Sequence, residues 1–337
     1  MKLLRTVRNL AATASIMGMA LASPSFADGQ SVRIGYDVVP IHLAPLIFGL
    51  GNDVLPNKGV NYEPDLIRFR GSSLQLQALA ADELDIAVLA FSTLAAGIVN
   101  ARQDIVAIAD VAQDGPGFSS VYGVLEDSEI QTVEDLDGKV LSINRAGGAV
   151  DMAARVVLTK AGLTPGSDVT ILEAGFGGQE AMLREGKTDV AVFIAPFWSR
   201  AQKTGGIRPL FHQRDGLGDT QFLLYAAKKD FIAENREVLV NVMEDYIRGI
   251  RWLTDEANRD AALDMIAAWN KNDRSNYEAW ALIPSEDYRH DANGKVNVDA
   301  MQSNINTLHE LGLLRKTLDV NDIVDHSLVE EAAARIK

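Results

Sequence analysis

The feature that most constrains the fold is a pattern of residues that occurs twice, at a fixed offset of 104 positions. The first copy has Gly71, Gln75, Leu79, Asp85, Ala87 and Val88, which return as Gly175, Gln179, Leu183, Asp189, Ala191 and Val192. Each copy has the pattern of a glycine-opened loop, an amphipathic helix, a turn and a buried strand. The repeat predicts two related halves, although six matches in about 18 positions also fit the general composition of helix–strand units.

Short apolar runs alternate with amphipathic stretches from residue 28 to about residue 228. The runs that predict strands are 32–35, 85–89, 105–109, 140–143, 169–172 and 189–194. This alternation predicts an α/β protein with mainly parallel strands. Ligands of open α/β sheets bind beyond the carboxyl ends of the strands, so two such edges that face each other would form a cleft.

Two breaks in the pattern predict where the chain crosses between the halves. Residues 113–117 contain a Gly-Pro-Gly turn sequence, and a return crossing is expected around 208–215. The predicted lobes are lobe I, from 28–115 and 213–337, and lobe II, from 116–212. They are two Rossmann-like units joined by two crossover strands that form a hinge. Long helices are expected after residue 228, with Trp252, Trp269 and Trp280 as packing residues.

The first 27 residues have the pattern of a secretory signal peptide. A basic start with Lys2, Arg5 and Arg8 precedes an apolar run, and Ser25 and Ala27 are small residues at the expected cleavage site. A membrane anchor is the alternative, but the apolar run of about a dozen residues is shorter than the roughly 20 that a spanning helix needs. Since the chain has no cysteine, it has no site for lipobox-type lipid attachment. We therefore expect a lipid-free protein in the periplasm.

The composition excludes several classes of function. After the leader, 29 Lys and Arg stand against 46 Asp and Glu, a formal charge of −17, and repulsion from phosphate disfavours nucleic acid as a partner. The absence of cysteine excludes disulfides and thiolate chemistry. The five histidines lack metal-ligand spacing, and no G-x-S-x-G element marks a serine nucleophile. We expect no catalysis, no metal and no cofactor.

Short motifs spaced along nearly the whole mature chain form a recognisable series. They are Ile34-Gly35-Tyr36, Ala44-Pro45-Leu46, Ala78-Leu79, Leu84-Asp85-Ile86-Ala87, Val133-Glu134-Asp135-Leu136-Asp137-Gly138-Lys139, Thr188-Asp189-Val190-Ala191 and Ala195-Pro196. In this order the motifs resemble the periplasmic binding proteins of ABC importers for nitrate, sulfonates and taurine, the alkanesulfonate-binding and thiamine-pyrimidine-synthase-like group. The resemblance implies a type II periplasmic binding protein fold, a small-molecule ligand, and a monomer that docks on an ABC permease with its ATPase.

Three loops of lobe I precede predicted helices and would present hydroxyl and backbone N–H groups to the cleft. Their candidate ligand residues are Tyr36, Asp37, His42, Gly71, Ser72, Ser73, Phe91, Ser92 and Thr93. The hydroxyl groups among them also suit helix N-caps, a role that is compatible with ligand contact.

Lobe II offers a corresponding loop after the predicted strand at 140–143. Its candidate ligand residues are Asn144, Arg145, Gly147 and Gly148, with Phe176, Gly178, Pro196 and Phe197 as the facing wall. Arg145 is the strongest candidate to hold an anionic group, because its guanidinium lies at a predicted helix N-terminus. The alternative is a surface arginine paired with an acidic neighbour.

Asp37 opposite Arg145 suits a ligand that carries both an amine and an acid, such as taurine. An aromatic or pyrimidine-like solute is the alternative, because several aromatic residues lie in the same loops. The sequence therefore predicts a solute-binding subunit of an ABC importer, for a sulfonate, a taurine-like compound or another organic acid. A ligand-sensing subunit for a membrane receptor would use the same cleft. The enzymes of the similar group carry a cysteine-rich iron site, which this chain lacks.

Overall fold

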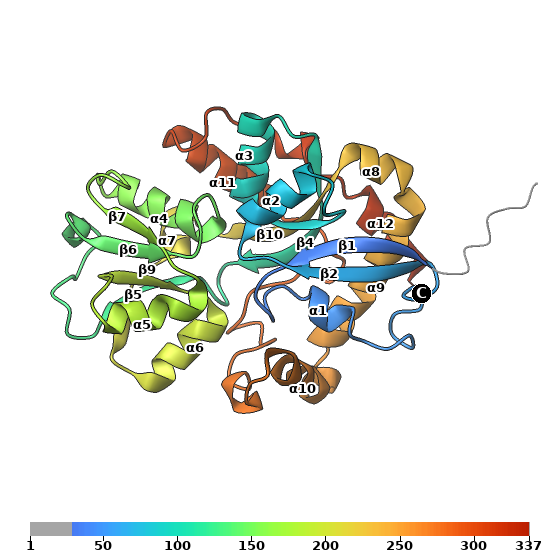
Figure 1. Ribbon diagram of the computed structural model, residues 1–337, viewed down its shortest axis with the longest axis horizontal. Helices are drawn as coiled ribbons and strands as arrows, with labels where there is room; N and C mark the ends of the chain where they lie inside the picture. Colours follow the sequence, from blue (N-terminus) through green and yellow to red (C-terminus); the bar gives the residue numbers. More distant parts are fainter. Residues whose placement is uncertain (1–28, 337) are drawn as a thin grey trace, which may run out of the picture.

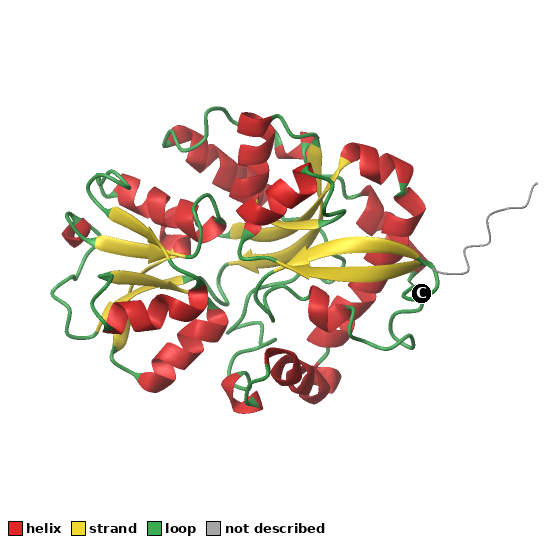
Figure 2. Cartoon of the chain, in the orientation of Figure 1, coloured by secondary structure: helices red, strands yellow, loops and turns green. Residues whose placement is uncertain are grey.

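The computed structural model describes residues 29–336, so the predicted signal peptide at 1–27 lies outside the described residues. Figure 1 shows two groups of elements, each built around β-strands. The strands of the group at the left all fall between Val121 and His212, and the other strands form the group at the right. Helices lie around the strands of both groups, as the red and yellow ribbons of Figure 2 show.

The first group of strands forms two sheets that meet. Its strands are β1 (Gln30–Tyr36), β2 (Tyr62–Arg68), β3 (Ala87–Ala90), β4 (Ile105–Asp114) and β10 (Thr220–Lys228). β1 and β2 pair in parallel, and β10 lies between β3 and β4, antiparallel to both. The Gly35 amide donates to the Ile86 carbonyl at 2.9 Å, which connects β1 to the segment that enters β3.

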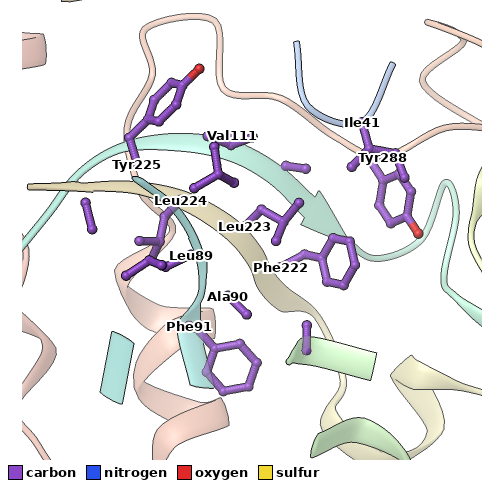
Figure 3. Close-up of a cluster of buried hydrophobic side chains, with 14 of the residues drawn as sticks. Ile41, Leu89, Ala90, Phe91, Val111, Phe222, Leu223, Leu224, Tyr225 and Tyr288 are labelled. Atoms are coloured by element: carbon purple, nitrogen blue, oxygen red, sulfur yellow. The ribbon is translucent and has the colours of Figure 1, made fainter. Parts of the chain in front are cut away.

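Helices cover the first group from several sides. They are α1 (Ala44–Ile47), α2 (Ser72–Ala80), α3 (Phe91–Ala101), α8 (Lys229–Glu234), α9 (Arg236–Thr254), α10 (Arg259–Asn270), α11 (Val298–Glu310) and α12 (Ser327–Arg335). Every residue of β4 is buried, since α3 and α12 both pack against it. Figure 3 shows the hydrophobic side chains that β10 contributes to this core, with Leu89 and Phe91 beside them.

The second group is a five-stranded sheet in the order β7-β6-β8-β5-β9. Its strands are β5 (Val121–Leu125), β6 (Val140–Ile143), β7 (Thr170–Glu173), β8 (Val190–Phe193) and β9 (Ile207–His212). Its helices are α4 (Ala149–Lys160), α5 (Gln179–Arg184), α6 (Ala195–Thr204) and α7 (Gln213–Leu217). α6 has a proline in its first turn, Pro196, where a missing N–H costs no hydrogen bond.

The prediction of mainly parallel strands is confirmed, because in each group all but one of the described strands run in the same direction. β6 runs parallel to β7 and β8, but β5 is antiparallel to β8 and β9. β5 and β10 are the strands through which the chain enters each group from the other, and both run against their neighbours. Apolar periodicity reports burial and not direction, so the sequence pattern could not distinguish these strands from the rest.

Both copies of the repeated pattern fold as the predicted helix, turn and strand, α2–β3 and α5–β8. The two aspartates have the same role: Asp85 accepts a hydrogen bond from the Arg33 amide and Asp189 from the Val140 amide, each at 2.8 Å. In both copies the carboxylate therefore fixes the start of one strand to its neighbour, which explains why the same residue recurs at this position.

The sequence indicated that the chain returns to the first group around 208–215. In the structure the return comes a few residues later. Residues 208–215 form β9 and the start of α7, and α7 packs against α4 of the second group. The return instead follows Leu217, and Thr220 at the start of β10 pairs with Asp114 at the end of β4. The two connections between the groups therefore lie side by side.

Trp269, predicted to be a packing residue, does not lie in the core. Its side chain is 44% exposed, whereas Trp280 is 5% exposed. Trp269 lies near the end of α10, and its ring meets the edge of the Tyr36 ring at a centroid distance of 6.2 Å. Helical periodicity predicts which face of a helix is apolar. It does not show whether a distant segment of the chain covers every aromatic ring on that face.

Candidate functional site

The two groups of elements touch along one side through hydroxyl groups at the N-termini of α2 and α3. Ser73 Oγ donates to the Ala146 carbonyl at 2.9 Å, and Thr93 Oγ1 donates to the Gly147 carbonyl at 3.0 Å. Ser92 Oγ lies 3.5 Å from the same Gly147 carbonyl. These side chains come from the first group and the carbonyls from the loop after β6, so they hold the groups together.

Gly71 shows how close this contact is. Its φ of 111° lies in the region that favours glycine, and a Cβ atom there would lie 3.3 Å from Cβ of Arg145. A second contact lies elsewhere along the boundary, where Lys203 Nζ of α6 donates to the Ser275 carbonyl at 2.7 Å. The structure therefore has a closed arrangement, with a cleft between the two contacts.

The innermost part of the cleft is a small pocket of about 40 Å³. It is lined by Asp37, Val38, Ile41, His42, Gly71, Ser72, Asn144, Gly148, Ala149, Val150, Phe176, Ile194, Phe222 and Leu223. A volume of this size holds about three water molecules. Most of the wall is apolar, with four polar side chains from both groups, so the inner pocket suits a small head group that makes a few directed hydrogen bonds.

Asp37 and His42 form the polar side of the inner pocket on the first group. The Asp37 amide donates to Nδ1 of His42 at 2.9 Å, and burial lowers the pKa of His42 to about 3. The ring is therefore neutral and carries its proton on Nε2, a hydrogen-bond donor. Burial raises the pKa of the Asp37 carboxyl to about 6, although the charges of Arg68 and Arg70 oppose that rise.

The other two polar side chains retain unused hydrogen-bonding capacity. Ser72 Oγ accepts a hydrogen bond from the Ala90 amide at 3.0 Å, so its own proton remains a donor. Asn144 Oδ1 is buried and has no hydrogen-bond partner among residues 29–336. Since an unpaired buried acceptor is costly, this oxygen marks a place where a ligand N–H group would be favourable.

Next to the inner pocket lies a cavity of about 510 Å³, here called the basic mouth. The mouth is lined by Asp37, Val38, Arg68, Arg70, Asn144, Arg145, Glu173, Ala174, Gly175, Phe176, Gly177, Gly178 and Phe197. Arg145 pairs with Glu173 at 3.1 Å, both side chains being about two-fifths exposed at 41% and 43%. Arg145 therefore has the acidic neighbour of the alternative prediction, and it also lines the mouth.

Arg68 and Arg70 are cations that the sequence analysis missed. Both are exposed at the end of β2 and just before Gly71, and neither forms a salt bridge within the part of the chain that the structure describes. The signal available in the sequence was their position directly before the first glycine of the repeat. These two guanidinium groups, more than Arg145, are free to attract an anion to the mouth.

The remaining predicted ligand residues lie at three kinds of position. Ser73, Ser92, Thr93 and Gly147 form the contact between the groups and do not line the inner pocket. Phe91 is fully buried in the core, where Figure 3 shows it below Ala90, and it lines none of these cavities. Tyr36 and Pro196 line a further groove next to the mouth.

Among the described residues, no group of three or more His, Cys, Asp and Glu side chains is arranged to hold a metal ion. In the same part of the chain, each helix is too short or too polar to cross a bilayer.

The model of the NMT1-like family matches residues 27–267. The chain belongs to the NMT1-like family. No curated protein matches the sequence. Structural similarity is extensive: the alkanesulfonate-binding protein SsuA from Xanthomonas axonopodis pv. citri, bound to MOPS, superimposes with a TM-score of 0.69 at 20% identity, over 89% of this chain and 99% of that one.

Two further solved structures have a fold similar to that of this chain. The nitrate-binding protein NrtA from Synechocystis PCC 6803 has a TM-score of 0.71 at 13% identity, covering 92% of this chain and 89% of that one. The desulfurization enzyme DSZB has a TM-score of 0.62 at 13% identity, covering 91% and 100%. These similarities confirm the predicted α/β fold of a periplasmic binding protein and show that an enzyme shares it.

Proposed function

We propose that this protein is the periplasmic solute-binding subunit of an ABC importer, which captures a small organic solute and delivers it to a permease. The observation that carries the proposal is the inner pocket, which is enclosed by side chains of both groups where Ser73 and Thr93 bridge them. The family and the fold are consistent with such a role. In this proposal the chain acts as a monomer without catalysis or cofactor.

The two groups act as lobes in this mechanism. Lobe I comprises 28–115 and 213–337 and lobe II comprises 116–212, with the return of the chain at Leu217 shifting the second boundary by a few residues. The lobes open about the two adjacent connections and close on the ligand. A ligand that contacts both lobes favours the closed state by its differential contacts, and the permease then recognises that state.

The ligand that best fits the polar groups is a small organic acid that also carries an amine, such as taurine. Asp37 and Asn144 offer acceptors to an ammonium group, whereas Arg68 and Arg70 attract a sulfonate or carboxylate at the mouth. The amine would therefore enter the inner pocket and the acid would remain outside it. This orientation differs from the sequence-based hypothesis, in which Arg145 held the acid.

A heterocyclic, pyrimidine-like solute is the second candidate. The rings of Phe176 and Phe197 stack at a centroid distance of 6.2 Å and an interplanar angle of 18°, and Phe176 lines the inner pocket. His42 and Ser72 would donate to ring nitrogens while Asn144 accepts an exocyclic N–H group. A role in signalling to a membrane receptor would use the same cleft, and it differs only in the partner that reads the closed state.

A thermal-shift screen of the mature protein tests this proposal directly. The panel contains taurine, alkanesulfonates, aliphatic and aromatic carboxylates, nitrate and pyrimidines, because a ligand that binds only the folded state raises the melting temperature. We expect amine-bearing acids to give the largest rise. If no compound shifts the transition, the solute-binding proposal fails. A rise with pyrimidines alone would replace the organic-acid ligand with the heterocyclic one.

A further inference from the structure

Beside the basic mouth lies a third cavity of about 560 Å³, here called the aromatic groove. It is lined by Tyr36, Asp37, Val38, Val39, Arg68, Pro196, Phe197, Arg200, Trp269, Asn270, Lys271, Asn272, Asn276 and Tyr277. One wall comes from the loop after β1 and the end of α10, and the other from α6 of the second group. The groove therefore lies in the cleft between the groups, where closure brings its walls together.

The groove presents aromatic rings from both walls. Trp269 is one of the few large hydrophobic side chains with substantial exposure among residues 29–336, at 44%, and it makes an edge contact with Tyr36. Across the groove stands Phe197, which stacks on Phe176 and lies 5.4 Å from the guanidinium of Arg200. Exposing an indole ring to water is unfavourable, so two aromatic walls beside a ligand pocket favour a flat apolar occupant.

The groove also carries more positive than negative charge, with three basic side chains and one carboxylate in its lining. Arg68 and Lys271 line it, are exposed, and form no salt bridge in the described part of the chain. Arg200 pairs at 3.1 Å with Glu180, a carboxylate that also pairs with Arg184, and Asp37 lies at the inner end of the groove. The groove thus combines flat aromatic walls with a cationic rim, which matches an aromatic ring with an anionic substituent.

Size favours the aromatic groove over the inner pocket as the place for a ring. The inner pocket has about 40 Å³ and the aromatic groove about 560 Å³, whereas an apolar cavity of about 150 Å³ is known to hold benzene. The aromatic groove therefore has ample room for a ring, and the inner pocket is the tighter of the two spaces. The cavities adjoin, because Asp37 and Val38 line all three of them and Phe197 lines both the mouth and the groove. A single ligand can place a small head group at Asp37 and a ring between Phe197 and Trp269.

We propose that the aromatic groove is a second ligand subsite, which holds a planar aromatic group with its acid near Arg68 and Lys271. This inference rests on the proposed solute-binding function and narrows its substrate class to aromatic acids with a small polar head group. Lys203 of α6, bonded to the Ser275 carbonyl, closes the boundary beside this subsite. The groove is therefore completed only when the two groups are closed.

Isothermal titration calorimetry with a matched pair of probes tests the subsite. Taurine has the amine and the sulfonate without a ring, and 4-(aminomethyl)benzenesulfonate has both groups on an aromatic ring. We expect wild type to bind the aromatic probe at least tenfold more tightly than taurine. Trp269→Ala should weaken the aromatic probe about five- to tenfold and leave taurine within a factor of two, because only the aromatic probe reaches the indole. Trp269→Phe should restore most of the loss.

The possible results distinguish a failure of the aromatic subsite from a failure of the proposed solute-binding function. Binding of taurine without any preference for the aromatic probe overturns the aromatic subsite alone. An equal loss of both probes in Trp269→Ala also overturns it, because such a loss indicates a general structural role. If wild type binds neither probe, the amino-sulfonate ligand and the subsite both fail. Tryptophan fluorescence is an independent readout: the aromatic probe should change the emission of wild type, and Trp269→Phe should lose most of that change.

Discussion

The two copies of the repeated unit have the same fold but meet the cleft in different ways. In the first copy, a Cβ atom added at Gly71 would lie in tight contact with Arg145, 3.3 Å from its Cβ, and the helix that follows uses Ser73 to bind the opposite loop. In the second copy, Gly175, Gly177 and Gly178 line the basic mouth, and a Cβ atom added at any of them would meet nothing within 4 Å. One copy therefore closes the cleft, while the other leaves space in it.

The largest expected effect comes from adding a single methyl group to the closing glycine. Gly71→Ala forces φ of 111° on a residue with a side chain and crowds Arg145, at a cost of about 1–3 kcal/mol in the closed state. We expect affinity for the best ligand to fall about a hundredfold in calorimetry. Gly177→Ala is the matched control, and affinity should be nearly unchanged because its surroundings are open. An equal loss of affinity in Gly71→Ala and Gly177→Ala would contradict the proposed difference, in which only the first copy closes the cleft.

The next effect concerns the carboxylate of the first lobe. Asp37→Asn should weaken an amine-bearing ligand about thirtyfold in calorimetry, because a charge-assisted hydrogen bond in the inner pocket is lost. Glu185→Gln, the same chemical change at an exposed residue of the second lobe that lines none of these cavities, should have little effect.

The same carboxylate predicts a pH dependence. The pKa of Asp37 is raised to about 6, so its charged form predominates only above that pH. Affinity for a cationic amine should therefore rise as pH increases from 5 to 7 and level off above about 7, measured by titration calorimetry. In Asp37→Asn the slope should be absent. A slope that persists in the variant would assign the titration to another group.

A smaller effect is expected from the hydroxyl groups that bridge the lobes. Thr93→Val removes the donor to the Gly147 carbonyl, and a hydrogen bond of this kind contributes about 1 kcal/mol, so affinity should fall about fivefold. Thr170→Val on the exposed strand β7 is a control with the same change in shape. An unchanged affinity in Thr93→Val would mean that this contact does not favour the closed state.

The smallest effect distinguishes the arginines of the mouth. Arg68→Ala should weaken an acidic ligand about threefold, with a loss that shrinks as salt increases, because exposed charges are screened. Arg145→Ala should change affinity less, since that guanidinium already pairs with Glu173. A larger loss in Arg145→Ala would restore the sequence-based hypothesis that Arg145 holds the acid.

The sequence predicted the parts of this architecture that depend on local pattern. The repeated helix and strand, and the aspartate that begins each strand, follow from residue spacing and are present in the structure. Asp37, His42 and Asn144 were named because loops after strands meet at one edge of a sheet, and all three line the inner pocket. Whether they contact a ligand stays a prediction.

The features that the sequence did not predict depend on contacts between distant segments. Arg68 is an ordinary arginine at the end of a strand until the fold places it beside Asp37. Trp269 belongs to a helix whose period predicts packing, and only its neighbour Tyr36 places it in the cleft. The reversed direction of β5 and β10 was not predicted, since a crossing strand has the same apolar pattern as a parallel one.

The measurement that tests the central claim most directly is the distance between the lobes with and without ligand. Because the chain has no cysteine, spin labels can be attached to the double variant Val60→Cys and Lys187→Cys, whose positions are exposed in the first and second groups. Pulsed electron spin resonance should give a broad distribution without ligand and a single, narrower distance with saturating ligand. An identical distribution in both states would contradict closure of the lobes on a solute.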